Sequence, residues 1–199
     1  MIKLFATPKS HFSRKVRLLL DHLELPYELV DVGDVSSGDS SLFDGNPALG
    51  VPVLEDDEVW MLESDHIASY LVRTYDPGDR FDVLTESVDL LNARAVMNNI
   101  MANEVKLILA ERGGLDPSPH AYFQKALKSI ELGLSWLEAW SSLLKSENPG
   151  YAEFHLISLW EHLELYQLTE LNYPRLQELA EQLGHLETVR KSTPLSLAK

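Results

Sequence analysis

The sequence predicts an α/β domain followed by an all-helical domain, and three observations support this fold class. Short strand-like runs occur only before residue 76. Residues 76–83, "DPGDRFDV", place proline and glycine between two patterned regions, as is typical of a linker. Beyond the linker, apolar residues recur at helical spacing and no run indicates a strand. We therefore expect one domain at residues 1–76 and a second at residues 85–199.

The first domain is expected to follow the order β-α-β-loop-β-β-α. Its first helix has one apolar face, formed by Val16, Leu19, Leu20 and Leu23, and should end at Pro26. A hairpin is indicated later, with the acidic residues Glu55-Asp56-Asp57 as its turn. In order, the expected elements are a strand at 2–5, the helix before Pro26, a strand at 27–32, a polar loop at 33–45 with room for a short helix, the hairpin within 51–62 and a helix at 63–76.

The second domain is expected to contain four longer helices and one short one. Ser118 before Pro119 indicates an N-cap followed by proline at the first helical position. The segment 151–168 is apolar on nearly all sides, so it should be buried. The expected helices span 84–112, 119–145, 151–168 and 174–183, and the short one precedes Pro194.

Composition limits the classes of partner. The formal net charge is −14, and both halves are acidic: residues 1–80 hold 7 Lys and Arg against 15 Asp and Glu, and residues 81–199 hold 10 against 16. Such a surface repels phosphates, so we expect no nucleic-acid partner. The chain has no cysteine, which excludes disulfides, thiolate metal sites and a cysteine nucleophile.

We also expect a cytoplasmic protein without a membrane partner. The segment "MIKLFATPKS" at the start lacks the apolar core of a signal peptide. No segment approaches the roughly 20 apolar residues that a membrane span requires. The absence of cysteine is consistent with a reducing compartment.

Three stretches in the first domain resemble the glutathione S-transferase superfamily. These are "SHFSRKVRLLLDHLELPYELVDV", "NPALGVPVL" and "LESDHIASYLVRTYD", and together they cover most of residues 1–76. The second half is similar in its helical pattern only. The resemblance is to a divergent, bacterial-like member of the serine type. It implies a thioredoxin-like glutathione-binding domain joined to a helical domain, and a homodimer.

The second and third stretches carry the residues that the resemblance assigns to glutathione binding. Pro52 cannot donate to a sheet, so it belongs at the start of a strand or at an edge. The resemblance implies a cis Val51–Pro52 bond, with the Val51 backbone free to pair with glutathione as a short added strand. It assigns Glu63 and Ser64, at a helix start, to the γ-glutamyl carboxylate. An ordinary trans proline and a plain N-cap are the alternatives.

The first stretch raises the question of a catalytic residue. In the resembled family a Tyr, Ser or Cys near the start of the first helix handles the glutathione sulfur. This chain has no cysteine, and its first tyrosine, Tyr27, falls in the second expected strand. The resemblance therefore places Ser10 in this role, as a hydrogen-bond donor that stabilises the thiolate. The alternative is that Ser10 is only the N-cap of the helix, and the two roles compete for one hydroxyl unless Ser13 or Thr7 caps the helix instead.

Neighbouring charged residues receive more ordinary interpretations. We expect His11 to be exposed to solvent and Arg14 to be solvated or paired with an acid. Of the 7 histidines, His155 and His162 are seven positions apart, roughly 10 Å along a helix, which is too far for one ion. No His-Glu-x-x-His motif occurs. We therefore expect no metal site.

The leading functional hypothesis is a glutathione transferase that joins the thiolate to a small apolar electrophile, as in detoxification. Gly50 departs from the resembled family, which often has Lys, Arg or Gln there to hold the glycine carboxylate of glutathione. Gly150 replaces the usual Ser or Thr of a capping box that ends at Glu153. Two alternatives therefore remain open: a non-catalytic regulator of the starvation-protein type, and a glutathione-dependent isomerase. The sequence does not name the electrophile.

Overall fold

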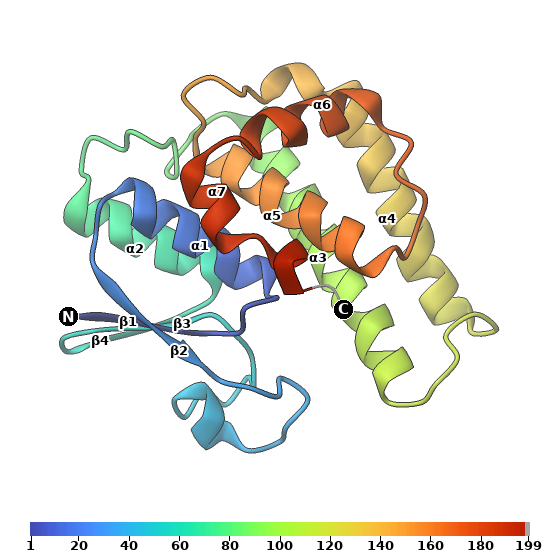
Figure 1. The fold of residues 1–199 in the computed structure, drawn as a ribbon, viewed down its shortest axis with the longest axis horizontal. Coiled ribbons are helices and arrows are strands. Elements are labelled where there is room, and N and C mark those ends of the chain that lie inside the picture. Colours follow the sequence, from blue (N-terminus) through green and yellow to red (C-terminus); the bar gives the residue numbers. More distant parts are fainter. Residues whose placement is uncertain (198–199) are drawn as a thin grey trace.

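A four-stranded mixed sheet is followed by helices alone in the computed structural model, which describes residues 1–197 (Figure 1). The expected fold class is therefore confirmed. No strand occurs after residue 62 in this part of the chain. Residues 198 and 199, the last two of the proposed helical domain, lie outside the described residues. We keep 1–76 and 85–199 as the proposed domain bounds. Within residues 1–197, no helix combines the length and apolarity that crossing a membrane requires.

The sheet has the strand order β2-β1-β3-β4. Strand β1 (Ile2–Ala6) pairs in parallel with β2 (Tyr27–Asp31) and antiparallel with β3 (Val53–Asp56), and β3 pairs antiparallel with β4 (Val59–Leu62). Helix α1 (His11–His22) connects β1 to β2, and α2 (Ser64–Tyr75) follows β4. Both helices lie over one face of the sheet (Figure 1). The N-terminal end of α1 is thereby held beside the edge where β1 ends.

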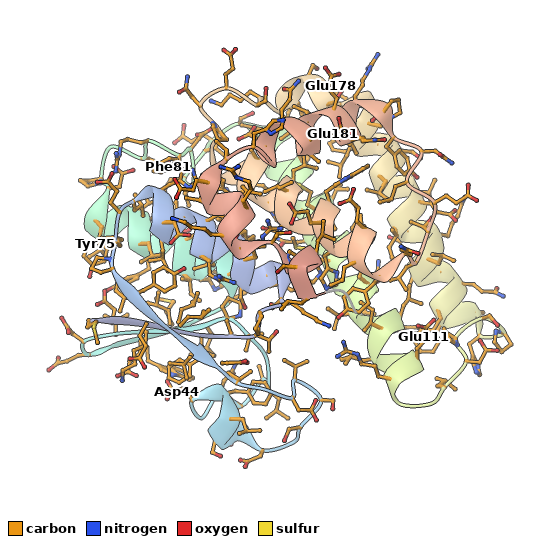
Figure 2. All side chains as sticks on the ribbon, in the orientation of Figure 1. Asp44, Tyr75, Phe81, Glu111, Glu178 and Glu181 are labelled. Atoms are coloured by element: carbon orange, nitrogen blue, oxygen red, sulfur yellow. The ribbon has the colours of Figure 1, made fainter. Side chains whose placement is uncertain are left out.

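The hairpin turn lies one to two residues later than predicted. Glu55 and Asp56 belong to β3, and the turn begins at Asp57, which has φ +50°. Asp56 is buried, and its carboxylate accepts hydrogen bonds from Tyr70 at 2.9 Å and Tyr75 at 2.5 Å. These two donors from α2 satisfy the buried charge, so an acidic residue is stable inside the strand. Tyr75 is labelled in Figure 2.

The remaining helices form a bundle beside the sheet domain. Helix α4 begins two residues later than predicted, and His120 is its N-cap residue without a side-chain hydrogen bond. Ser118 does not cap the helix because it belongs to a turn, in which its N–H donates to Asp116. The predicted helix at 84–112 begins four residues late, after the N-cap Ser87. The helices are α3 (Val88–Arg112), α4 (Ala121–Ala139), α5 (Tyr151–Tyr166), α6 (Pro174–Leu183) and α7 (Glu187–Ser192), with 3₁₀ turns η1 (Ser40–Phe43), η2 (Ser141–Leu143) and η3 (Pro194–Leu197).

Helix α5 is the central element of the molecule, since it packs against α1, α3 and α6. Every residue from 151 to 163 is buried, as its uniformly apolar pattern predicted. Its first turn is closed by Glu153, whose carboxylate accepts from the N–H groups of Gly150 at 2.7 Å and Lys145 at 3.1 Å. A Cβ at position 150 would lie 2.8 Å from the carbonyl oxygen of Phe81 in the linker (Figure 2). This close approach explains why glycine stands at this N-cap.

Candidate active site

A cleft of about 1050 Å³ separates the edge of the sheet domain from helices α3 and α5. One wall is the turn between β1 and α1, together with loop residues around 31–35 and 49–51. The opposite wall is largely apolar, and α3 and α5 contribute Ala102, Val105, Ile108, Leu109 and Leu165 to it. A cleft of this size with one polar and one apolar wall is suited to a small organic ligand.

Ser10 lines this cleft and is also the N-cap of α1. Its oxygen accepts hydrogen bonds from the Ser13 N–H at 3.2 Å and the Ser13 hydroxyl at 3.0 Å. A hydroxyl offers one donor and two acceptor positions. Capping uses only the acceptor positions, so the Ser10 proton remains available for a ligand in the cleft. The two roles predicted for Ser10 are therefore compatible rather than in competition.

Val51 lines the same cleft, and its peptide bond to Pro52 is cis, as the resemblance implies. Asn46 holds this loop in place, because its side-chain N–H₂ donates to the Gly50 carbonyl at 2.8 Å. Pro52 is buried behind Val51 and does not line the cleft. The fold thus brings Ser10 and Val51 together at one wall, with Pro52 behind them.

Glu63 and Ser64 do not line the cleft, and their hydrogen bonds differ from the expected ones. Glu63, at φ +70°, caps α2 with its own carboxylate, which accepts from the N–H groups of Asp65 at 3.0 Å and His66 at 3.2 Å. Ser64 is buried and donates its hydroxyl to the same carboxylate at 2.9 Å. The donors predicted to bind a ligand carboxylate are thus already occupied by a carboxylate of the chain.

Two cations at the cleft were not predicted. Lys9 lies beside Ser10, and Arg112 at the end of α3 reaches the cleft from the opposite side. Arg112 is exposed and donates to the hydroxyl of Tyr166 at 2.8 Å. No local pattern indicated Arg112, because it lies on a helix far along the chain from Gly50. These cations supply the positive charge that Gly50 does not.

Behind the cleft, a buried polar network centred on Asp65 joins the two domains. The Asp65 carboxylate accepts from Lys15 at 2.9 Å, Tyr151 at 2.9 Å and Asn98 at 2.6 Å. Arg94 lies 3.5 Å from the same carboxylate. Burial alone would raise the pKa of Asp65, but the charge of Lys15 and the hydrogen bonds outweigh it and hold that pKa well below its usual value. Burial lowers the pKa of Lys15.

His11 is buried, which contradicts the expectation that it faces solvent, and Arg14 is buried and paired with an acid, which is one of the two outcomes expected for it. The Arg14 side chain lies 3.0 Å from the Glu161 carboxylate and donates to the carbonyl oxygens of Ile157 and Val189, each at 3.2 Å. It therefore joins α1 to α5 and α7 rather than adding charge to the cleft. Polar side chains at the start of α1 are buried because the second domain covers this end of the helix.

His11 belongs to a second buried cluster, with Glu104 of α3 and His162 of α5. The imidazole rings of the two histidines stack with centroids 3.8 Å apart. Burial and the neighbouring His162 lower the pKa of His11 to about 4, so it is neutral at pH 7. Burial would raise the pKa of Glu104, but the hydrogen bond with His162 and the nearby His11 ring outweigh it and hold that pKa below its usual value. His11 and His162 line the cleft.

Helix α3 borders the cleft with the later part of its length, and its methionines do not reach the cleft. Met97 and Met101 are fully buried in the core, and Asn98 belongs to the Asp65 network. The residues that reach the cleft lie further along the helix, between positions 102 and 112.

Comparison with known proteins places the fold. Residues 4–80 match the family described as glutathione S-transferase, N-terminal domain. No curated protein matches the chain by sequence. A glutathione S-transferase from Methylobacillus flagellatus KT, solved with GSH bound, is 20% identical, with 98% of this chain and 100% of that chain covered and a TM-score of 0.81.

Two further solved structures have the same fold. Glutathione transferase E6 from Drosophila melanogaster is 24% identical, covers 99% of this chain and 93% of its own, and gives a TM-score of 0.80. The holo structure of maleyl pyruvate isomerase, described as a bacterial glutathione S-transferase in the zeta class, is 19% identical, with 98% and 97% covered and a TM-score of 0.74. The likeness therefore extends over nearly the whole of each chain.

Proposed function

We propose that this chain is a member of the glutathione S-transferase superfamily, whose N-terminal-domain model matches residues 4–80. We further propose that it binds glutathione in the cleft and joins the thiolate to a small, mostly apolar electrophile. The observation that carries the proposal is the Ser10 hydroxyl, whose proton is unused and which lies on the cleft wall at the N-terminus of α1. The apolar wall of α3 and α5 faces it and suits the electrophile.

Ser10 is proposed to stabilise the bound thiolate, not to act as a nucleophile. A free thiol has a pKa of about 8.5, which helix N-termini and neighbouring cations lower. Donation from the Ser10 hydroxyl to the sulfur adds one charge-assisted hydrogen bond. The Val51 backbone is proposed to pair with the peptide, while Lys9 and Arg112 attract its glycine carboxylate.

The γ-glutamyl end requires a local rearrangement. The Glu63 side chain is about half exposed, so it is free to leave the α2 amides. A ligand carboxylate then takes its place on those N–H groups, and the ligand's ammonium group pairs with the displaced Glu63. Pro52 and Ser64, both buried, support this wall from behind.

A glutathione-affinity column and thermal melting in millimolar glutathione test binding. We expect retention and a raised melting temperature. Failure of both tests would reject the glutathione hypothesis and favour a non-catalytic regulator. Two observations are consistent with that alternative: Glu63 occupies the amides expected for the ligand, and Gly50 has no charged side chain. Binding of glutathione without conjugation of any electrophile would favour the isomerase alternative, since one protein of this fold is named as an isomerase.

Substitution of Ser10 tests the mechanism. Ser10→Gly is preferable to Ser10→Ala, because glycine at an N-cap costs only a few tenths of a kcal/mol. Loss of a charged hydrogen bond is worth about 1.5–3 kcal/mol, so turnover near neutral pH should fall roughly ten- to a hundredfold. Glutathione affinity should hardly change, and higher pH should recover part of the rate. Thr7→Ala is the matched control, because it removes a hydroxyl from the same wall of the cleft. If the Thr7 variant is inactive and the Ser10 variant fully active, then Thr7 and not Ser10 stabilises the thiolate.

We also propose a cytoplasmic homodimer. In support, large apolar side chains are exposed on β4, α2, α3 and α4: Trp60, Tyr75, Val88, Leu91 and Leu132. Sedimentation should give about twice the chain mass of 22.5 kDa. A species at the chain mass over all concentrations would exclude the dimer without touching the fold, and cell fractionation tests the location.

A further inference from the structure

The cluster of His11, Glu104 and His162 has the composition of a metal site. Two imidazoles and one carboxylate, with a position left open, form the protein ligand set of several catalytic zinc sites. The three residues come from α1, α3 and α5, and they meet where the two domains join. All three are nearly or fully buried, at 2%, 0% and 5% exposure respectively.

The spacing of the ligand atoms fits one ion. His162 Nδ1 lies 3.0 Å from Glu104 Oε1, and His11 Nε2 lies 3.5 Å from Glu104 Oε2. Ligands bound at about 2.1 Å around a tetrahedral ion lie about 3.4 Å from one another. The candidate ligand atoms of all three residues lie within 4.8 Å of one another, so the two stacked rings must rotate to bring the widest pair to that spacing.

The cluster also leaves polar atoms without partners. Within the described residues, His11 Nε2 and Glu104 Oε2 are buried and make no hydrogen bond. The polar groups that face the Glu104 carboxylate there are the two imidazoles. A buried carboxylate without a full cationic partner is costly. A bound cation would remove this cost and satisfy both unpartnered atoms.

We propose that His11, Glu104 and His162 bind one divalent transition-metal ion of the zinc type at the wall of the cleft. His11 and His162 line the cleft, so the ion can enter from it and its open coordination position faces it. Borderline nitrogen and oxygen ligands favour Zn²⁺ and its neighbours over Mg²⁺ or Ca²⁺. The acidic surface of the chain raises the local concentration of cations.

Binding has one identifiable local cost. His11 Nδ1 accepts a hydrogen bond from the Phe12 N–H at 3.1 Å, so the neutral ring carries its proton on Nε2. Coordination through Nε2 moves this proton to Nδ1 and gives up that bond. His162 likewise carries its proton on Nε2 once Nδ1 is a ligand.

Zinc titration of the chelator-treated full chain tests the proposal. Calorimetry should give one Zn²⁺ per chain, and the melting temperature should rise with free Zn²⁺. Cobalt(II) should give a visible absorption band typical of low coordination, which Zn²⁺ abolishes. These measurements need no glutathione, so failure of metal binding leaves the transferase proposal standing, and the reverse also holds.

Two variants locate the ion. Removing a residue that only hydrogen-bonds to a metal ligand lowers metal affinity by about 10–100-fold. Removing a ligand itself, in Glu104→Gln or His162→Gln, should therefore lower Zn²⁺ affinity by at least about a hundredfold. The matched control replaces the exposed His66, His120 and His185 with Gln together, and it should bind as the parent does. No cobalt band or heat of binding in the parent would overturn the proposal, even if the Glu104 variant failed to fold. Loss of Zn²⁺ binding in the control variant alone would show that the ion binds at surface histidines, which would overturn the proposal.

Discussion

Replacement of Asp65 by alanine should be among the most destabilising single changes in this protein. The substitution removes the acceptor of three hydrogen bonds at once, from Lys15, Asn98 and Tyr151. Tyr151 keeps a second acceptor, the Ser64 carbonyl at 3.3 Å. Lys15 is 0% exposed, and its remaining hydrogen-bond partners are Asn98 Oδ1 at 2.9 Å and the ring of His155 at 3.4 Å. The main cost is therefore a buried ammonium group without its counter-charge.

Removal of one partner of a buried ion pair costs about 3–5 kcal/mol, and we expect Asp65→Ala to fall in this range. Lys15→Met should cost less, because the Asp65 side chain is 23% exposed and keeps Asn98 and Tyr151 as donors. The double variant leaves no unpaired buried charge. Its cost should be smaller than the sum of the two single costs, by about 0.5–3 kcal/mol.

Urea unfolding at pH 7, followed by fluorescence, measures these differences. Glu86→Ala removes an exposed carboxylate just before α3 and should stay within about 0.5 kcal/mol of the parent. An Asp65→Ala variant within 1 kcal/mol of that control would show that water or a side-chain shift satisfies Lys15. Costs that simply add in the double variant would show that the two residues do not interact.

The lowered pKa of Asp65 also fixes the direction of the pH dependence. A carboxyl group whose pKa is lower in the folded than in the unfolded state stabilises the fold above its unfolded pKa, about 3.9. This stability is lost as the pH falls through the folded value. The difference between parent and Asp65→Ala should therefore be constant from about pH 5 to 8 and shrink below about pH 4.

The remaining predictions concern two close approaches and one cation. Gly150→Ala should destabilise the fold by about 1–3 kcal/mol in urea unfolding, because the new Cβ lies 2.8 Å from the backbone oxygen of Phe81, which cannot easily move. Gly133→Ala should gain up to about 1 kcal/mol of helix propensity but lose more, since its Cβ lies 2.9 Å from Ile100 on α3; a raised melting temperature would show that Ile100 rotates away. Arg112→Ala should weaken glutathione binding in calorimetry, with a smaller effect at high salt, and an unchanged affinity would remove Arg112 from the carboxylate site.

Local sequence patterns were sufficient to predict the fold class and most elements. Helical periodicity located the helices, and the uniformly apolar segment 151–168 correctly indicated the buried α5. The errors fell at element ends, where single contacts decide. The Ser118–Pro119 signal was overruled by a turn on Asp116, and the hairpin turn moved because two tyrosines of α2 satisfy Asp56.

The site was predictable only where its residues are neighbours in the sequence. The position of Ser10 at a helix start follows from a short motif, and the cis Val51–Pro52 bond was implied by the resemblance of its surrounding stretch. At Glu63 the motif was ambiguous, because the same amides are satisfied equally well by a ligand carboxylate or by the Glu63 side chain. His11, Glu104 and His162 lie on three separate helices, so no spacing rule connects them. A prediction of no metal site from histidine spacing therefore tested only pairs on one helix.

The N-terminal turn of α1 explains why a serine there is suited to a chemical role. Its residues are bound to four other helices. His11 contacts Glu104 of α3 and His162 of α5. Arg14 is bound to α5 and α7, and Lys15 is bound to α2 and α3. Each of these contacts crosses from one segment of the chain to another far from it. Ser10 therefore projects into the cleft from a support that cannot rotate without breaking several buried polar contacts, which holds its free proton in one place. Because α3 and α5 also form the opposite wall, a change that moves either helix should alter the distance between Ser10 and whatever the apolar wall binds.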